Sequence, residues 1–263
     1  MRKHIALIGL FSLMSISLTG CGTHVGHYAN ADKYLAGNQT YSEEITSLDI
    51  DWISGSVTLV EDETVTGVKV EEVTDLTKEK EWVHSYIDNG KLMIKFFASN
   101  TWCSKMFGYT KELTVTYHPG LESVNVDLTS GSLKAESITA KEVDIEMTSG
   151  KANINKIIAD SVDVDLTSGN IEIKDITAKD FDADLTSGTI TTGFTAIEKA
   201  SYDLTSGKIN LTLPEDGGTV KVSKTSGSVV TERECSVNNS TYKFGSGAAD
   251  IKVSMTSGKL IIK

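Results

Sequence analysis

The sequence predicts an all-β protein, a single-stranded right-handed β-solenoid whose coils take about nineteen residues each. A Ser-Gly pair recurs every nineteen residues, at Gly131, Gly150, Gly169, Gly188 and Gly207. Between these pairs apolar and polar residues alternate, which is the two-residue period of a β-strand. No comparable 3.6-residue period, which would indicate helices, runs through the repeats.

The repeat that begins at Val162 illustrates the expected coil. Val162, Val164 and Leu166 should face inward, whereas Asp163 and Asp165 should face solvent. The glycine of the following turn permits a positive φ or a close approach between stacked backbones. We therefore expect each repeat to form a strand, a turn and a second strand.

Equivalent positions of successive repeats should stack into inward columns, because one coil alone buries too little apolar surface to fold. We expect the coils to stack in chain order, with the turn of Gly227 following that of Gly207 after twenty residues. Further copies of the turn occur at Gly55 and Gly258. The four predicted inward columns are Val124, Val143, Val162, Phe181, Ala200; Val126, Ile145, Val164, Ala183, Tyr202; Leu128, Met147, Leu166, Leu185, Leu204; and Leu133, Ala152, Ile171, Ile190, Ile209.

The N-terminus has the order of a secretory signal. Arg2 and Lys3 precede a mostly apolar run over residues 5–18, too short for a membrane span. The next residues, Leu18-Thr19-Gly20-Cys21, resemble the lipobox of bacterial lipoproteins. That resemblance implies cleavage after residue 20, acylation of Cys21, and an extracytoplasmic protein anchored to the bacterial cell membrane by lipid.

The rest of the chain divides into three parts. Residues 21–40 comprise the lipidated cysteine and small polar residues without a period, which predict a flexible tether. Residues 41–120 predict an irregular β portion that caps the N-terminal end, although Leu48–Gly55 repeats the coil motif once. Residues 121–263 form the repetitive solenoid.

The charge of the chain excludes some classes of partner. The formal net charge is −11, and loss of the two positive charges in residues 1–20 would make it −13. Arg233 would be the one remaining arginine. An acidic surface repels phosphates, so we expect no nucleic acid partner.

The outward acidic residues should stack in two rows, and in these rows five aspartates are candidate calcium ligands: Asp144, Asp163, Asp165, Asp182 and Asp184. Calcium prefers six to eight oxygen ligands, which neighbouring carboxylates could supply. The alternative is a solvated acidic face that prevents aggregation. We expect no other metal site or cofactor. Identical carboxylates on an open face lack the asymmetry of a catalytic acid pair, so no catalytic residue is predicted.

Two other features admit two interpretations each. Cys103 and Cys235 could form a disulfide outside the cytoplasm, or remain separate, partly buried thiols. The aromatic segment 96–109 could cover the end of the solenoid, or present a contact site for a protein or a sugar. The candidate contact residues in that segment are Phe97, Trp102, Phe107 and Tyr109.

Six turn threonines should form an outward ladder: Thr129, Thr148, Thr167, Thr186, Thr205 and Thr225. Threonine favours strands, and its hydroxyl groups can hydrogen bond between neighbouring coils. A regular polar array of this kind could also contact a surface glycan.

The repeated VDVDLTSG motif, the opening LDIDWISG and the closing FGSGAADIKVSMTSGKLII resemble the bacterial putative-adhesin domain family over about residues 41–263. The resemblance implies a right-handed β-helical fold on the outer side of the envelope and carries over no catalytic motif. Three hypotheses follow. The first is an adhesin-like, non-catalytic binding or scaffold module. The second is an envelope-stress or signalling accessory that binds a membrane partner, and the third is a polysaccharide-active enzyme.

Overall fold

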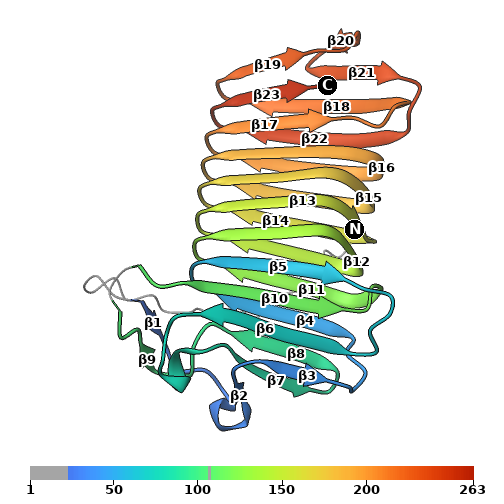
Figure 1. Ribbon diagram of the computed structural model, residues 1–263. Helices are drawn as coiled ribbons and strands as arrows, with labels where there is room; N and C mark the ends of the chain where they lie inside the picture. Colours follow the sequence, from blue (N-terminus) through green and yellow to red (C-terminus); the bar gives the residue numbers. More distant parts are fainter. Residues whose placement is uncertain (1–22, 106–107) are drawn as a thin grey trace, which may run out of the picture.

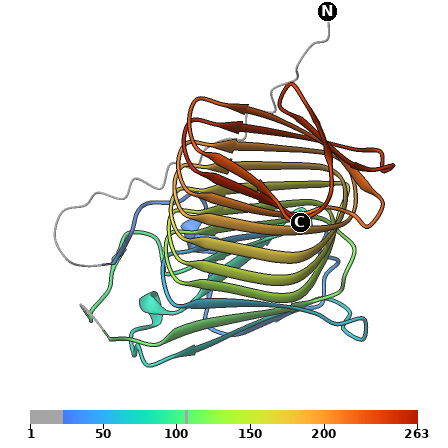
Figure 2. The ribbon, with the colours of Figure 1, turned by 90° about the horizontal axis from the view of Figure 1, so that it is seen from above.

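The computed structural model describes residues 23–105 and 108–263, and it confirms the predicted all-β solenoid as a stack of coils (Figure 1). Each coil has one strand before a Ser-Gly turn and one strand after it. The strands before the turns pair side by side as the pre-turn sheet, and those after the turns pair as the post-turn sheet. From above, successive coils trace one flattened loop after another (Figure 2).

The pre-turn sheet is parallel over nine strand segments. In spatial order these are β8 (Lys91–Lys95), β4 (Ser47–Trp52), β11 (Leu121–Leu128), the second half of β12 (Ser132–Met147), β14 (Ser161–Leu166), the second halves of β15 (Asn170–Leu185) and β16 (Thr189–Leu204), β22 (Ala249–Met255) and β18 (Gly217–Lys224).

The post-turn sheet runs opposite to it and starts with one antiparallel strand. In spatial order its members are β6 (Val68–Thr74), β10 (Lys111–Tyr117), β5 (Ser56–Glu61), the first half of β12, β13 (Lys151–Ile158), the first halves of β15 and β16, β17 (Lys208–Thr212), β23 (Lys259–Ile262) and β19 (Ser228–Thr231).

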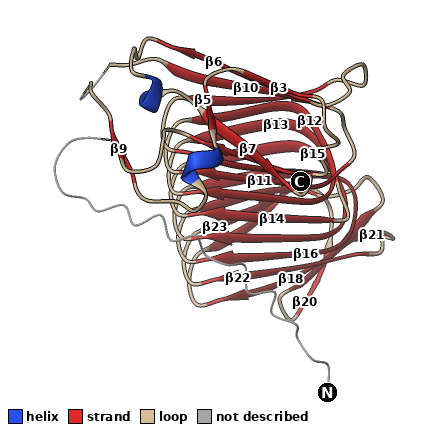
Figure 3. Ribbon diagram, turned by 90° about the horizontal axis from the view of Figure 1, so that it is seen from below, coloured by secondary structure: helices blue, strands red, loops and turns tan. Residues whose placement is uncertain are grey.

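Antiparallel strands cover both ends of the stack, and two short helices join them at the N-terminal end, which limits edge-to-edge pairing. At the C-terminal end these are β21 (Thr241–Gly245) and β20 (Ser236–Asn238). Figure 3 views the N-terminal end, where both 3-10 helices lie. The elements there are β1 (His24–Val25), η1 (Ala31–Lys33), β2 (Leu35–Ala36), β3 (Gln39–Tyr41), η2 (Glu79–Glu81), β7 (His84–Asp88) and β9 (Thr101–Trp102).

The predicted stacking in chain order is correct from Gly131 to Gly207 and wrong beyond it. The coil of Gly258, made by β22 and β23, lies between those of Gly207 and Gly227 (Figure 1). The Lys259 amide donates to the Gly207 carbonyl at 2.9 Å, and the Ser228 amide donates to the Gly258 carbonyl at 3.0 Å. The last coil of the chain is therefore the penultimate coil of the stack.

The coil of Gly55 stacks next to that of Gly131, although residues 56–120 separate the two motifs in the chain, because β8 and β10 lie on its other side. Strands β4 and β5 pair directly with the first regular coil, and the Ser132 amide donates to the Gly55 carbonyl at 2.9 Å. The motif at residues 48–55 therefore forms a full coil of the solenoid, and the irregular cap consists of the elements around it.

The inward columns match the prediction over the regular repeats. Val124, Val143 and Val162 lie in register, and Val126, Ile145 and Val164 form the next column. All six side chains are buried. The columns continue to Leu48 at one end and to Ile251 at the other, where the inserted coil completes the same core.

The tether predicted for residues 21–40 is wrong over its described part, residues 23–40. β1 pairs with β9, β2 pairs with β7, and β3 pairs with β6. Val25 is buried in the common core, as is Tyr41 at the end of β3. Small polar residues without a period do not by themselves exclude folding, because neighbouring strands can supply their backbone partners.

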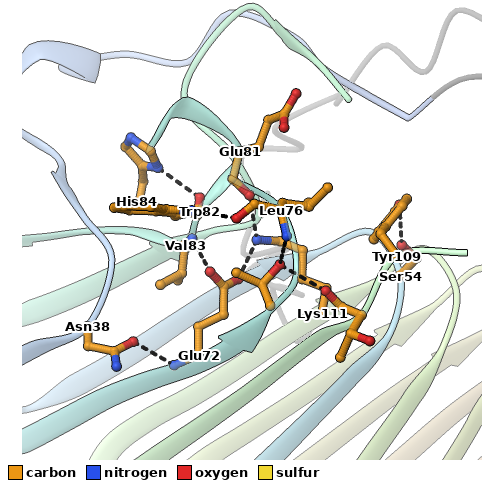
Figure 4. Close-up of polar contacts among 12 residues, drawn as sticks. Asn38, Ser54, Glu72, Leu76, Glu81, Trp82, Val83, His84, Tyr109 and Lys111 are labelled. Carbon is orange, nitrogen blue, oxygen red and sulfur yellow. Dashed lines mark hydrogen bonds and ion pairs between the residues drawn. The ribbon is translucent and has the colours of Figure 1, made fainter. Parts of the chain in front are cut away.

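A buried ion pair between β10 and β6 also connects the cap helix η2 to the post-turn sheet (Figure 4). The Lys111 ammonium group pairs with the Glu72 carboxylate and donates to the Glu81 carbonyl at 3.0 Å. It also lies 5.1 Å from the ring centroid of Trp52 and 4.7 Å from that of Phe96. Burial lowers the pKa of Lys111 to about 8, although Glu72 opposes that shift.

The turn glycines allow the coils to approach each other at the backbone. Gly150 has φ of 116°, and a Cβ atom there would lie 2.9 Å from the Gly131 nitrogen and closer still to its carbonyl oxygen. The same arrangement recurs from Gly131 to Gly207, so this column has no space for a side chain.

Replacing Gly150 by alanine should therefore destabilise the fold strongly. The positive φ alone accounts for roughly 1–3 kcal/mol of lost unfolding free energy, and the clash with Gly131 adds to it. Gly26→Ala is the matched control, because a Cβ atom there would meet nothing within 4 Å. Denaturant unfolding of both variants checks this, and an equal loss in both would contradict it.

Candidate functional site

The outward side chains of the pre-turn sheet form two columns of acidic residues, which we call the acidic ladder. The backbone register places the carboxylates of successive coils directly above one another, about 4.8 Å apart. The first column contains Asp51, Asp127, Glu146, Asp165, Asp184 and Asp203, and the second contains Asp49, Asp144, Asp163 and Asp182, with Asn125 between the first two. The two acidic rows predicted from the sequence are thus in register.

Two lysines neutralise the charge of the carboxylates at the N-terminal end of the ladder. Lys95 pairs with Asp51, and Lys91 pairs with Asp49. Among the residues described by the structure, the carboxylates from Asp127 to Asp203 have no such salt-bridge partner within 4.0 Å. The middle of the ladder is therefore an array of like charges.

Partial burial and this crowding raise the pKa values of several carboxyl groups in the ladder. Partial burial, followed by repulsion from Glu146 and Asp163, raises the pKa of Asp144 to about 7. Partial burial, followed by repulsion from neighbouring carboxylates, also raises the pKa of Asp165 to about 6 and that of Asp182 to about 6. Near neutral pH some carboxyl groups of the ladder are consequently protonated, so the array can both donate and accept hydrogen bonds.

The five aspartates considered as calcium ligands lie along the ladder on successive coils. Within residues 23–105 and 108–263, no three acidic, histidine or cysteine side chains come together as a candidate metal site. Asp144, Asp163 and Asp182 extend from successive parallel coils, whereas calcium needs six to eight oxygens around one centre. The parallel rows of carboxylates fit the alternative interpretation, a solvated acidic face. The calcium site stays a hypothesis from the sequence.

The turn threonines extend this polar surface to a groove near the C-terminal end. Their order differs from the prediction, because Thr256 lies between Thr205 and Thr225. The groove has a volume of about 530 Å³. The residues that line it come from four neighbouring coils: Asp184, Leu185, Thr186, Asp203, Leu204, Thr205, Ser223, Lys224, Thr225, Ser254, Met255 and Thr256. Lys224 introduces a positive charge beside the ladder.

The aromatic segment 96–109 does not form one exposed contact site. Phe97 is fully buried with Phe96 against the cap, and the centroids of the two rings lie 4.4 Å apart. Tyr109 is partly buried, and its hydroxyl group hydrogen bonds with those of Thr23 and Ser54. Trp102 is 49% exposed, whereas Phe107 lies outside the described residues.

Phe97 must therefore be removed from the predicted contact residues. The sequence shows a cluster of aromatic residues, and strand alternation after Leu92 and Ile94 would bury Phe96 alone. The chain bends after the end of β8, and both Phe96 and Phe97 are buried there. In the described part of this segment Trp102 alone remains as an exposed aromatic candidate.

The two described cysteines are not partners of one disulfide. Both thiols are free and partly buried. Cys103 follows β9 at the N-terminal end, and Cys235 precedes β20 at the opposite end of the stack (Figure 1). The separate thiols, which were the alternative interpretation, are what the structure contains.

Sequence reasoning missed two features. One is the buried Lys111–Glu72 pair, because an isolated lysine in a sequence predicts an exposed side chain. The other is the pairing of the N-terminal residues, His24 with Trp102 and Val25 with Thr101. The short alternation of Thr23 to Val25 is too brief to predict a strand.

Comparison with known proteins identifies the domain. The family model described as Toastrack DUF4097 matches residues 45–263. No curated protein matches the chain.

Several solved structures are similar to the chain at low sequence identity. A putative cell adhesion protein from Clostridium sporogenes is 16% identical, with TM-score 0.42, over 88% of this chain and 99% of the other. A putative adhesin from Bacteroides fragilis is 14% identical, with TM-score 0.46, over 86% and 96%. A putative adhesin from Parabacteroides merdae is 14% identical, with TM-score 0.48, over 91% and 99%.

The acidic ladder should make the stability of the protein depend on pH. Because folding raises the pKa of Asp144 to about 7, the folded state binds protons that the unfolded state releases, and stability falls as the pH rises through that value. We expect Asp144→Asn to raise the melting temperature by a few degrees at about pH 8 and by less at about pH 5, because the stability is lost progressively between the pKa of the unfolded state and that of the folded state.

Asp175→Asn is the matched control, since Asp175 is exposed on the post-turn half of β15, away from the ladder. Differential scanning calorimetry at both pH values measures the effect. An equal gain for Asp144→Asn at the two values would show that repulsion in the ladder is not its cause.

Proposed function

The chain belongs to the Toastrack DUF4097 family, and we propose that it is a non-catalytic, lipid-anchored surface protein of the bacterial envelope with an adhesin-like binding role. The acidic ladder and the adjoining turn threonines carry this proposal. They repeat the same outward groups on each regular coil, at the spacing of β-strands.

A regular polar array suits a partner that is itself extended and polar. Each coil offers only carboxyl and hydroxyl groups, and each such contact is weak in water. A surface glycan presents hydroxyl groups along its length, so several coils can bind one chain at once and their contributions combine. Carboxyl groups with a raised pKa can donate to those hydroxyl groups as well as accept from them.

The alternatives have less support. A signalling accessory that binds a membrane protein through segment 96–109 would depend mainly on Trp102, because Phe97 is buried. A polysaccharide-active enzyme needs two carboxyl groups in clearly different environments. In the ladder, burial and neighbouring carboxylates raise the pKa values of Asp144, Asp165 and Asp182 in the same direction.

The proposed anchor rests on the sequence. The basic residues, the apolar run and Leu18-Thr19-Gly20-Cys21 all lie outside the residues that the structure describes. Two or more acyl chains on Cys21 would hold the protein firmly at a bilayer. In the described part of the chain, no helix has the length and apolar character needed to cross a membrane.

Binding to glycans tests the role of the ladder. The wild-type protein should bind glycans on an array or on intact envelopes. The triple variant Asp144→Asn, Asp163→Asn, Asp182→Asn should lose most of that binding, because it removes the second column of carboxyl groups. The control Glu136→Gln, Glu172→Gln makes the same type of change on the post-turn sheet. Absence of wild-type binding, or equal loss in the control, would contradict the proposal.

The anchor has a separate test. Cys21→Ser should abolish incorporation of a palmitate analogue and move the protein from the detergent-rich to the aqueous phase in a cloud-point separation. The reason is that acylation requires the thiol of that residue. Cys235→Ser should leave both properties unchanged, because that thiol lies at the far end of the solenoid. Persistent labelling of Cys21→Ser would remove the anchor from this account.

A further inference from the structure

The first residues that the structure describes, Thr23 to Val25, are hydrogen bonded directly to the cap. The Thr23 carbonyl accepts a hydrogen bond from the Cys103 amide at 2.9 Å, and its hydroxyl group bonds with that of Tyr109 at 2.8 Å. His24 and Val25 pair with Trp102 and Thr101 in a separate two-stranded ribbon, which we call the β1–β9 ribbon. Residues before Thr23 therefore start from a fixed point on the protein surface.

This attachment sets how far the anchor can lie from the ribbon. Cys21 precedes Thr23 by two residues, and two fully extended residues span at most about 7 Å. Acyl chains on Cys21 would thus enter the bilayer next to the ribbon. The flexible tether expected from the sequence would have allowed any distance and any orientation.

The ribbon has an inner and an outer side. Val25 and Thr101 are buried beneath it, whereas the Trp102 side chain is 49% exposed. The Trp102 and His24 rings stack with their centroids 4.3 Å apart. Trp52, in contrast, is buried in the core. An exposed tryptophan is the side chain that proteins favour at the interface between lipid and water, because its ring is apolar and its N–H group donates a hydrogen bond.

The ribbon and its flanks carry no acidic side chain of their own. In the described part of the chain, the two acidic side chains that contact them are Glu81, which is buried against Ser104, and Asp75, which pairs with Lys105. Neither residues 23–29 nor residues 98–105 contain an aspartate or a glutamate, in a chain that has 36 of them. Anionic headgroups repel carboxylates over about a Debye length. The ribbon can therefore approach a bilayer closely, whereas the acidic ladder cannot.

We propose that the β1–β9 ribbon docks on the surface of the bilayer that holds the Cys21 anchor, with Trp102 among the lipid headgroups. The proposal rests on the lipidation proposed above and adds the part of the surface that meets the membrane. The cap lies against the bilayer, and the C-terminal end of the stack is the end farthest from the anchor.

Fluorescence quenching by lipids tests this docking. The full-length acylated protein is reconstituted in vesicles of phosphatidylcholine and phosphatidylglycerol that carry bromine or a spin label near the headgroup. We expect the quenching of tryptophan emission to be several-fold larger in the wild type than in Trp102→Phe, which retains Trp52 and Trp82. Equal quenching in the two proteins would overturn the docking of Trp102.

Flotation of the same vesicles separates failure of this proposal from failure of the anchor. A protein that floats with the vesicles without quenching of Trp102 retains its anchor but does not dock through the ribbon. A protein that does not float contradicts both proposals. Protection of Trp102 from the lipid quencher together with crosslinks between copies would identify a second copy as the occupant of this surface, and would also overturn the docking.

A longer connection provides a second measurement that does not alter the ribbon. Inserting about ten glycine and serine residues between Gly22 and Thr23 would let the cap move away from the bilayer by tens of ångströms. Flotation should persist, and the quenching of Trp102 should fall. Unchanged quenching would mean that Trp102 binds lipid without help from the nearby anchor, which overturns the part assigned to the short connection.

Discussion

The hydrogen bond between stacked glycine turns sets the geometry of the whole molecule. In each regular coil the amide of the residue after the glycine donates to the glycine carbonyl of the coil beneath, at 2.9 or 3.0 Å from Lys151 to Lys208. The backbones approach so closely there that a side chain has no space. Because every coil repeats this contact, the remaining residues of the motif also lie directly above the equivalent residues of the coil beneath.

This alignment of equivalent residues stabilises the core of the protein and destabilises its acidic surface. Inward, it stacks valine on valine and leucine on leucine and forms one continuous core. Outward, it stacks aspartate on aspartate, which raises the pKa of Asp144 and its neighbours. The acidic ladder thus lowers the stability of the fold near neutral pH.

The cap is stabilised by other contacts than the repeated register of the solenoid. Its strands are short and antiparallel, and they are held by contacts between distant segments, such as Lys111 with Glu72 and Trp52. The sequence around Lys111 does not predict that the rings of Trp52, Phe96 and Phe97 lie close to its ammonium group. For the same reason the aromatic segment could be recognised as part of the cap, but the exposure of Trp102 and the burial of Phe97 could not be separated beforehand.

The sequence alone determined the coil, the inward columns and the acidic rows, because strand alternation and a nineteen-residue period are properties of neighbouring residues. It could not determine the order of the coils. The motifs of Gly207, Gly227 and Gly258 are nearly equivalent, so any of them could stack on any other. The tertiary structure places Gly258 between the other two, where β22 and β23 bury their alternating apolar residues on both sides. It also attaches residues 23–41 to the cap, because the partners of their short strands lie in distant segments of the chain.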